Sequence, residues 1–245
     1  MKILGMIPAR FASTRFPGKP LQEIEGIPMI IHVMKRTMLC KDLDEVFVAT
    51  DTKQIYDVVK KYNCKAIMTS GKHKTGTDRI AEAVKNIDCD MVVNIQGDEP
   101  LVKPDHISKV IAPLKEDRSL NIATLMCETD QFNQTNECKM VVNLKNEVMY
   151  FSRSDIPSNL RLKHNRLFKL YSIVAFKKEF ILKFASWELS PLEKIEYIEY
   201  LRALEHGYRM KAALVEEPSQ SVDTPNDLEL VRRLMKKDNI KHMYL

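Results

Sequence analysis

The chain of 245 residues contains no long hydrophobic run. No window approaches the ~18 consecutive uncharged apolar residues that a membrane-spanning helix requires. The first residues also lack the successive basic, apolar and small-residue zones of a signal peptide, because the chain enters an apolar stretch at once. From these two absences we expect a cytoplasmic protein without a membrane span.

Patterns typical of disulfides, metal centres and nucleic-acid surfaces are also missing. The five cysteines are odd in number and none forms a CxxC pair, and the six histidines show no metal-ligand spacing. Free thiols in a reducing compartment are therefore expected. The net charge of +5 has no single basic tract behind it, which favours solvated helix faces over a nucleic-acid surface, although part of this charge suits an anionic substrate.

The first half of the chain shows a regular alternation of strands and helices. Apolar stretches at residues 2–7, 45–50, 65–68 and 90–95 predict strands, and a stretch with helical spacing follows each of them. Such an alternation is typical of an α/β fold with a doubly wound, mainly parallel sheet.

The second half predicts a different arrangement. Strands are expected at residues 121–127, 139–143, 148–151 and 168–176, with few helices between them, which indicates a smaller antiparallel lobe over about 121–176. Helices at 178–185 and 191–206, a strand at 210–215 and a last helix from Thr224 or Pro225 complete the pattern. No linker interrupts the sequence, so the whole chain, residues 1–245, is predicted to be one domain.

Three cations stand in the loop after the first strand. The strand is expected to end before Pro8, and the loop that follows carries Arg10, Arg15 and Lys19. Cations spaced along one loop can surround a polyanion, since arginine offers a flat fork and lysine a mobile point charge to phosphate oxygens. The loop lacks the two glycines that a Walker loop has ahead of its lysine. Its spacing alone leaves two interpretations open: a loop that grips a triphosphate, or a solvated basic loop.

A second candidate loop spans residues 72–79, just ahead of a predicted helix. Thr77 or Asp78 is expected to cap this helix, whose N-terminus offers backbone donors to an anion. Arg79 adds another cation. Taken alone, a surface loop with an N-cap is the simpler interpretation.

Two aspartates follow predicted strands. Asp98 comes directly after the buried strand at 90–95, where an unpaired charge is costly, so it is expected to meet an arginine or a metal ion. Asp223 follows the strand at 210–215, and an alternative role for it is the N-cap of the last helix. Because two carboxylates and triphosphate oxygens commonly hold Mg²⁺, Asp98 and Asp223 are candidate magnesium ligands.

Together these motifs resemble the 3-deoxy-manno-octulosonate (KDO) cytidylyltransferase family over nearly the whole chain. The matching segments are IPARFASTRFPGKPL, GIPMIIHV, VATD, HKTGTDR, VNIQGDEP, MYFSRSDIP, SPLEKIEYIEYLRALEHG and VDTPNDLE. The resemblance implies a Rossmann-like nucleotidyltransferase fold, a homodimer formed through the antiparallel lobe, and Mg²⁺ as cofactor. It also implies transfer of CMP from CTP to the anomeric hydroxyl of a 3-deoxy-2-keto sugar acid with release of pyrophosphate, for lipopolysaccharide or capsule synthesis.

The resemblance further implies a role for individual residues. On the nucleotide side, Arg10, Arg15 and Lys19 would hold the phosphates, and Asp98 and Asp223 would bind the metal. The nucleoside pocket would be lined by Pro8, Ala9, Thr77 and Gln96, with Arg79 as a further nucleotide-binding residue. The catalytic residues would be Arg10, Lys19, Asp98 and Asp223. On the acceptor side, Arg153 would bind the carboxylate of the sugar acid. Glu196 and Glu199 are expected at i, i+3 on one helix, with at least one of them meeting sugar hydroxyls.

Three residues depart from the family pattern. Leu170, Val174 and Tyr200 stand where the family has a sugar-facing His, a pocket Tyr and a Gln, whereas the nucleotide and metal motifs are intact. We therefore predict an active CMP transferase that takes KDO or a KDO-like ulosonic acid, with a poor kcat/KM for KDO itself. The alternatives are a CMP transferase for a modified acceptor such as an amino-ulosonic acid, a non-catalytic CTP-binding protein, and a sugar-1-phosphate nucleotidyltransferase.

Overall fold

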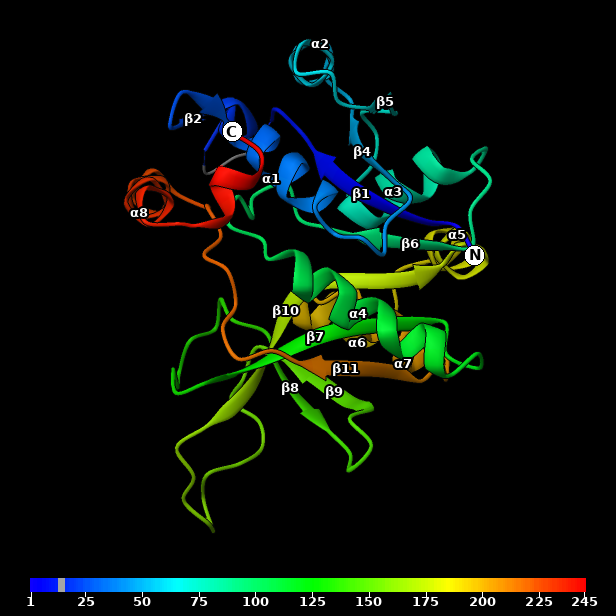
Figure 1. Ribbon diagram of the computed structural model, residues 1–245. Coiled ribbons are helices and arrows are strands. Elements are labelled where there is room, and N and C mark those ends of the chain that lie inside the picture. The colour runs from blue at the N-terminus through cyan, green and yellow to red at the C-terminus, as the bar shows by residue number, and fades with distance from the viewer. Residues whose placement is uncertain (13–15) are drawn as a thin grey trace. The chain divides into compact units, whose positions relative to one another are not determined.

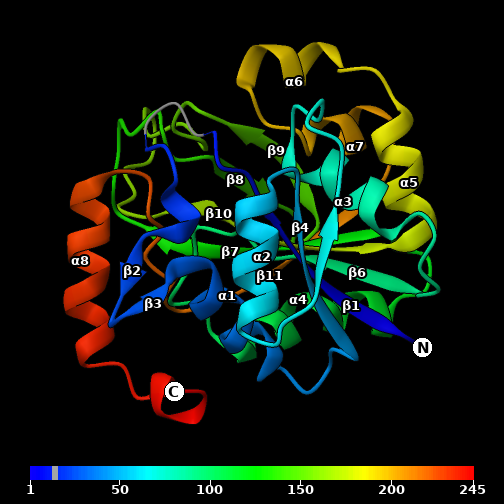
Figure 2. The same ribbon diagram turned by 90° about the horizontal axis from the view of Figure 1, so that it is seen from above.

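The computed structural model describes residues 1–12 and 16–245, and the chain divides into two compact units (Figures 1 and 2). The first unit combines Met1–Ser108 with Ser219–Leu245, and the second is Lys109–Pro218. The lobe predicted at about 121–176 lies within the second unit. No helix in these described ranges is long and apolar enough to cross a membrane.

The first unit is organised around a parallel sheet. Its strands are β1 (Ile3–Ala9), β4 (Glu45–Thr50), β5 (Ala66–Met68) and β6 (Met91–Asn94), in the order β6-β1-β4-β5. Helices α1 (Met29–Met38) and α3 (Gly76–Val84) lie on opposite sides of β1 and β4, and α2 (Lys53–Lys61) follows β4 (Figures 1 and 2). The doubly wound, mainly parallel arrangement predicted from the sequence is confirmed.

Burial explains why these strands form the centre of the unit. Leu4, Met6 and Ile7 of β1 have no exposed surface, as expected for a parallel strand covered on both faces. The remaining elements of this unit are β2 (Glu23–Ile24), β3 (Ile27–Pro28), α8 (Pro225–Lys236), two short 3-10 helices at Lys19–Leu21 and Ile240–Met243, and the start of α4 (Pro104–Glu116). Because β1 and β6 are parallel, their carboxyl ends open on the same edge of the sheet, where ligands bind in folds of this class.

The second unit contains the predicted antiparallel lobe. Strand β10 (Leu167–Lys177) pairs antiparallel with β7 (Ile122–Thr129) and β8 (Lys139–Val142), and β8 pairs antiparallel with β9 (Val148–Ser152). Strand β11 (Met210–Leu214) runs parallel to β7. The helices of this unit are α5 (Lys178–Ser186), α6 (Pro191–Glu196) and α7 (Leu201–Glu205).

Strand β1 is longer than predicted, since it continues through Pro8 to Ala9. A proline has no N–H to give to a neighbouring strand, but none is required here. The Met6 carbonyl accepts from the Ile95 amide at 3.0 Å. Pro8 is two residues further along the strand, so its backbone nitrogen faces the same edge of β1 as this carbonyl. The register with β6 has already ended at Asn94, so no ladder bond is lost while β1 continues its pairing with β4.

The cap of α3 also differs from the prediction. Thr75 is the N-cap, and its hydroxyl accepts from the Asp78 amide at 3.1 Å. Thr77 and Asp78 already lie inside the first helical turn, so the prediction that one of them caps the helix is wrong. The sequence offers several capping residues in a row, and the helix begins at the earliest of them.

The helix predicted at 191–206 is two helices. Tyr197 adopts a left-handed conformation with a φ of 54°, which ends α6. Glu196 is the last residue of α6, whereas Glu199 lies in the turn before α7. The prediction that these two carboxylates share one helix face is therefore wrong.

Candidate functional site

A cavity of the first unit lies where β1 and β6 end. Eight of its lining residues were expected from the sequence: Pro8, Ala9, Arg10, Lys19, Arg79, Gln96, Asp98 and Asp223. Thr77 is fully buried and does not belong to the lining. The predicted phosphate ligand Arg15 lies outside the described residues.

Two glycines allow loops to approach the end of β1. A Cβ atom on Gly97 would lie 2.7 Å from the Pro8 carbonyl oxygen, and one on Gly76 would lie 3.0 Å from Pro8 Cγ. Contacts this short leave no room for a larger residue at Gly97, because the opposing atom belongs to the backbone. The close approach of Gly97 brings the next residue, Asp98, to the edge of the sheet.

The ammonium of Lys19 lies between the two predicted metal ligands. Its Nζ atom is 2.8 Å from Oδ2 of Asp98 and 3.4 Å from Oδ1 of Asp223, and it donates to the Val222 carbonyl at 2.6 Å. The Val222 amide donates to the Asp98 carbonyl at 2.9 Å, which ties the two acidic segments together. Asp98 meets a cation, but this cation is Lys19 and not the expected arginine, and the expected metal ion stays a prediction.

Asp223 is not the cap of the last helix. Thr224 is the N-cap of α8, and it forms a capping box with Asp227, whose Oδ2 accepts from the Thr224 amide at 2.8 Å. The alternative role of Asp223 is therefore wrong. Its carboxylate lies beside Lys19 in the cavity.

A third acidic residue adjoins this pair. Glu99 is only 7% exposed, and burial, followed by the nearby charge of Asp98, raises its pKa to about 8. The hydroxyl of Ser219 donates to the Oε2 atom of Glu99. Burial thus favours the neutral form of Glu99 and limits the negative charge close to the Lys19 ammonium.

Arg79 lines the cavity, but its guanidinium is already paired. It donates to Asp51 Oδ2 at 2.7 Å and to Thr69 Oγ1 at 2.8 Å, and its side chain is 4% exposed. Asp51 follows β4 and Thr69 follows β5, so these bonds fix the first turn of α3 against the ends of both strands. In this structure Arg79 builds the wall of the cavity, and a direct bond to nucleotide would use its remaining donors.

Exposed cations complete the lining. Arg10 directly follows β1, and Lys74 stands in the loop ahead of α3. The helix start at Gly76 adds backbone N–H groups, which favour an anion. With Lys19 these groups suit the phosphates of a nucleotide.

The sequence reasoning assigned no individual role to six lining residues, although four of them lie in the candidate loop at 72–79. They are Pro20, His73, Lys74, Thr75, Gly76 and Gly97. A signal for Lys74 was present, since it is a second cation in the same pre-helical loop as Arg79. The role of Gly97 has no sequence signal of its own, because it depends on how closely the turn approaches Pro8.

The sequence model of a family described as Cytidylyltransferase matches residues 4–215. The chain belongs to the cytidylyltransferase family. The 3-deoxy-manno-octulosonate cytidylyltransferase of Geotalea daltonii is 43% identical to it, covering 96% of this chain and 99% of the relative, and that of Fusobacterium nucleatum is 40% identical, covering 98% and 100%. A solved structure of CMP:2-keto-3-deoxy-manno-octonic acid synthetase complexed with CTP matches with a TM-score of 0.94 and 35% identity, covering 97% of this chain and 99% of that one. The family resemblance and the predicted fold class are confirmed.

In this cytidylyltransferase the predicted acceptor residues lie in the second unit, around Arg153. Its guanidinium donates to the carbonyl of Asn136 at 2.8 Å and to those of Glu196 and Tyr197 at 3.3 Å each. The Glu196 carboxylate accepts from the Arg153 amide at 2.7 Å and from the Ser152 hydroxyl at 2.8 Å. The end of α6 thus positions Arg153, since helix C-terminal carbonyls favour a cation.

The three departures from the family pattern differ in their surroundings. Val174 has no exposed surface, and Tyr200 is 4% exposed with its ring packed against Phe151 and Phe176. Leu170, on β10, is partly exposed. Two of the three residues therefore contribute to the interior of the second unit of this cytidylyltransferase, and their predicted contact with the acceptor stays a prediction, as does that of Glu199.

Alanine in place of Gly97 should lower kcat/KM for CTP by roughly 10²-fold, because the added Cβ must push Asp98 and the end of β1 apart, and small misplacements of reacting groups have effects of this size. Steady-state kinetics with varied CTP measures the change. Gly71→Ala is the matched control, since its Cβ would lie 4.0 Å from the nearest atom and should leave kcat/KM nearly unchanged. Equal kinetics for the two variants would contradict the steric role of Gly97.

Proposed function

We propose that this cytidylyltransferase transfers CMP from CTP to the anomeric hydroxyl of KDO and releases pyrophosphate. The observation that carries the proposal is the convergence of Asp98, Asp223 and Lys19 on one cation-lined cavity. The relatives named above are KDO cytidylyltransferases, and this chain matches them over nearly their full length, which favours KDO over a modified acceptor. The cytoplasmic location expected from the sequence stays a prediction.

The donor set fits Mg²⁺. Oxygens of Asp98, Val222 and Asp223 surround one cationic atom, and hard oxygens are the ligands that Mg²⁺ prefers. Across the described residues, no group of three or more His, Cys, Asp or Glu side chains is placed to hold a metal by itself. Asp98 and Asp223 would hold the ion together with oxygens of the nucleotide, and the bound ion would neutralise phosphate charge.

The chain's own residues then perform the remaining tasks. The acceptor hydroxyl attacks the α-phosphorus in line, the bond to the bridging oxygen breaks, and pyrophosphate leaves. Arg10, Lys74 and Lys19 would neutralise the charge on the phosphates, and Lys19 would exchange its carboxylate partners for phosphate oxygens. Arg153 would bind the acceptor carboxylate and orient the attacking hydroxyl.

Pyrophosphate release from each common nucleoside triphosphate, measured with a panel of acceptors, tests the proposal. We expect release only with CTP, and fastest with KDO. A higher kcat/KM for an amino-ulosonic acid would support the altered acceptor expected from Leu170, Val174 and Tyr200. Release with a sugar 1-phosphate would indicate that class of enzyme, and CTP binding without release would indicate a non-catalytic protein.

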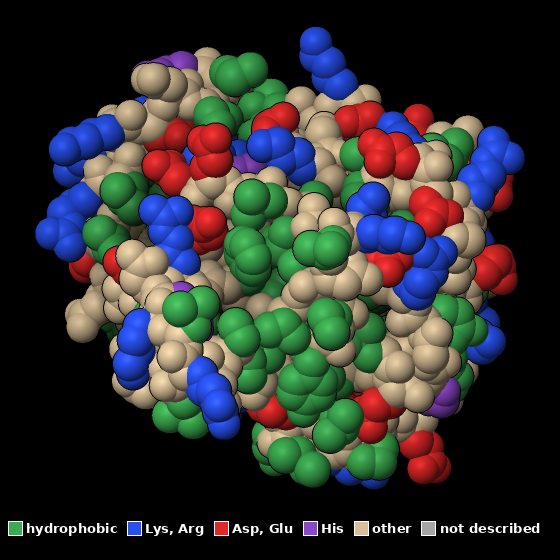
Figure 3. All heavy atoms as spheres, turned by 90° about the horizontal axis from the view of Figure 1, so that it is seen from below, with side chains coloured by type: hydrophobic (Ala, Val, Ile, Leu, Met, Phe, Trp, Pro, Cys, Tyr) green, Lys and Arg blue, Asp and Glu red, His purple; other side chains and the backbone are tan. Residues whose placement is uncertain are grey.

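We further propose that the protein is a homodimer formed through the lobe at about 121–176. Within the described part of the chain, β9 forms a ladder with β8, and an isolated bridge between Glu147 and Lys211 joins the start of its other edge to β11, so the pairing along this second edge is incomplete. Met149 of β9 is 64% exposed and Leu214 of β11 is 49% exposed. Figure 3 shows hydrophobic side chains gathered near the centre of the face viewed from below Figure 1.

Light scattering at assay concentration should therefore give twice the chain mass of 28.4 kDa. Met149→Lys places a charge at an exposed position of β9 and should shift the mass toward that of one chain. Met243→Lys, at an equally exposed methionine of the first unit, is the control and should leave the dimer intact. A wild-type protein with the mass of a single chain would reject the dimer.

A further inference from the structure

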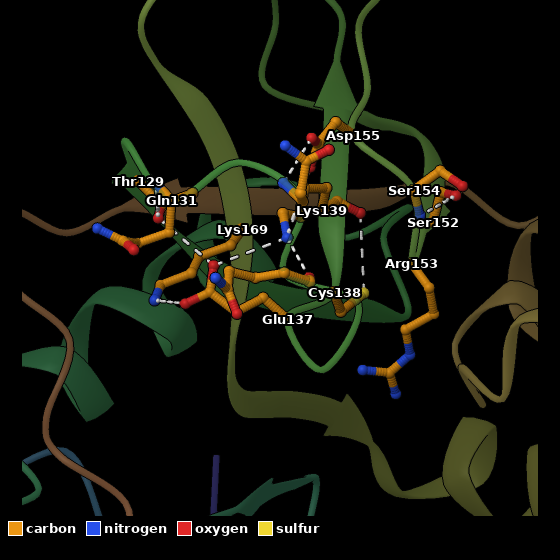
Figure 4. A network of polar contacts seen from close by, with 12 residues as sticks. Thr129, Gln131, Glu137, Cys138, Lys139, Ser152, Arg153, Ser154, Asp155 and Lys169 are labelled. Atoms are coloured by element: carbon orange, nitrogen blue, oxygen red, sulfur yellow. Dashed lines mark hydrogen bonds and ion pairs between the residues drawn. The ribbon is translucent and has the colours of Figure 1, made fainter.

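A lysine of the second unit is completely buried. Lys139, at the start of β8, has no exposed surface, and its ammonium donates to the Gln134 carbonyl. The same Nζ atom lies 3.7 Å from Oδ1 of Asp155 and 3.8 Å from Oε2 of Glu137 (Figure 4). Burying an ammonium is costly unless it is well paired, so these oxygen partners must compensate for the water that the ammonium loses.

The cluster fixes one segment of chain, residues 133–138. Asp155 Oδ2 accepts from the Asn133 amide at 2.8 Å, one residue before the carbonyl that Lys139 holds. Glu137, in the same segment, also pairs with Lys169 at 2.5 Å. Two lysines and two carboxylates thus anchor the segment through both backbone and side chains.

The anchored segment reaches Arg153 directly. The carbonyl of Asn136, inside this segment, accepts from Nη1 of Arg153 at 2.8 Å. In Figure 4 the Arg153 guanidinium points away from the Lys139 ammonium, so the two cations do not compete for the same partners. The Nε and Nη2 atoms of Arg153 donate to the end of α6, and the segment at 133–138 supplies the opposing contact.

These bonds leave a defined donor pair. A guanidinium has five N–H donors, and three are used by the carbonyls of Asn136, Glu196 and Tyr197. One N–H remains on each of Nη1 and Nη2. Two N–H groups on these two nitrogens can bind the two oxygens of a carboxylate.

We propose that Lys139 is a positioning residue for the acceptor: it acts through the segment at 133–138 to set the direction of the Arg153 fork. The proposal rests on the proposed function, in which Arg153 binds the carboxylate of the sugar acid. A lysine that only stabilised the fold would affect both substrates alike. A positioning residue affects the acceptor and leaves CTP binding unchanged, because the nucleotide cavity belongs to the first unit.

A double-mutant cycle tests this. Lys139→Met should raise KM for KDO by at least about tenfold and leave KM for CTP within twofold, since it loosens the acceptor fork alone. Arg153→Ala should raise KM for KDO further, and adding Lys139→Met to Arg153→Ala should produce no additional change, because coupled residues are not additive. Arg166→Met, which removes an exposed cation of the second unit that pairs with Glu128 outside the segment at 133–138, is the control and should change KM for KDO less than threefold.

Three results would overturn the proposal. The first is a Lys139→Met enzyme with unchanged KM for KDO, the second is an equal rise in both KM values, and the third is additive effects in the cycle. If Lys139→Met does not fold, Asp155→Ala cuts the tie to Asn133 and must show the same selective rise in KM. A wild-type enzyme that does not turn over CTP and KDO would overturn the proposed function. An active wild-type enzyme without the selective KM effect would overturn only the role of Lys139, so the two failures are distinguishable.

Discussion

Asparagine in place of Asp98 or Asp223 should lower kcat for pyrophosphate release from CTP by about 10²-fold or more, because each variant loses one charged oxygen donor to the metal. The two carboxylates converge on a single cation position, at 2.8 Å and 3.4 Å from Lys19 Nζ, so neither can replace the other. Each substitution retains the shape of the side chain and leaves Lys19 one acidic partner. We therefore expect little change in the thermal midpoint.

A titration with Mg²⁺ at saturating CTP makes the test specific. Both variants should require more Mg²⁺ for half-maximal rate than the wild type. Asp57→Asn is the control, since Asp57 pairs with Lys53 on the exposed surface of α2 and should behave like the wild type. Near-normal kcat in the Asp98 or Asp223 variant would remove that residue from the metal site.

The strands of the first unit were predictable because burial on both faces leaves a nearly continuous apolar signature, as in β1 and β6. The boundaries that failed depend on features that one segment alone does not contain. Pro8 remains in β1 because β6 has already ended beside it, which no local pattern around Pro8 reveals. Tyr197 ends α6 by adopting a left-handed conformation that a non-glycine residue rarely takes, so the apolar spacing of 191–206 indicated one helix.

The cavity was predictable to the extent that its residues follow strands. Asp98 follows β6 closely, and Lys19 and Asp223 reach it from the loop after β1 and from the segment before α8. Ion pairs between side chains that are distant in the sequence were harder to predict. Arg79 is bound to Asp51, whose sequence position 28 residues earlier gives no hint of the contact. The sequence likewise does not indicate that Lys139, at the start of a strand, is buried.

Methionine in place of Lys19 should lower kcat by about 10²-fold, because the variant loses a cation aimed at the phosphates in the transition state. It should also change how the protein responds to a divalent ion in the absence of CTP. In the wild type the Lys19 ammonium occupies the space between Asp98 and Asp223, and its side chain is 12% exposed. An ion that uses both carboxylates must displace this ammonium.

The thermal midpoint with and without Mg²⁺ measures this second effect. The Lys19→Met variant should be less stable than the wild type without Mg²⁺, since Asp98 and Asp223 then repel each other, and Mg²⁺ should raise its midpoint more than that of the wild type. At tenfold excess over Kd, the linkage of binding to folding amounts to about 1.4 kcal/mol, which a melting curve resolves.

Two further variants separate charge from packing at this position. Lys19→Arg keeps the cation and should show the small Mg²⁺ response of the wild type, whereas adding Asp98→Asn to Lys19→Met should abolish the large response because one of the two carboxylates is gone. A Lys19→Met enzyme with the Mg²⁺ response of the wild type would show that the ammonium and the metal do not compete for the same oxygens. Unchanged kcat in the same variant would leave Lys19 with a structural role, as the link between the loop after β1 and the segment before α8.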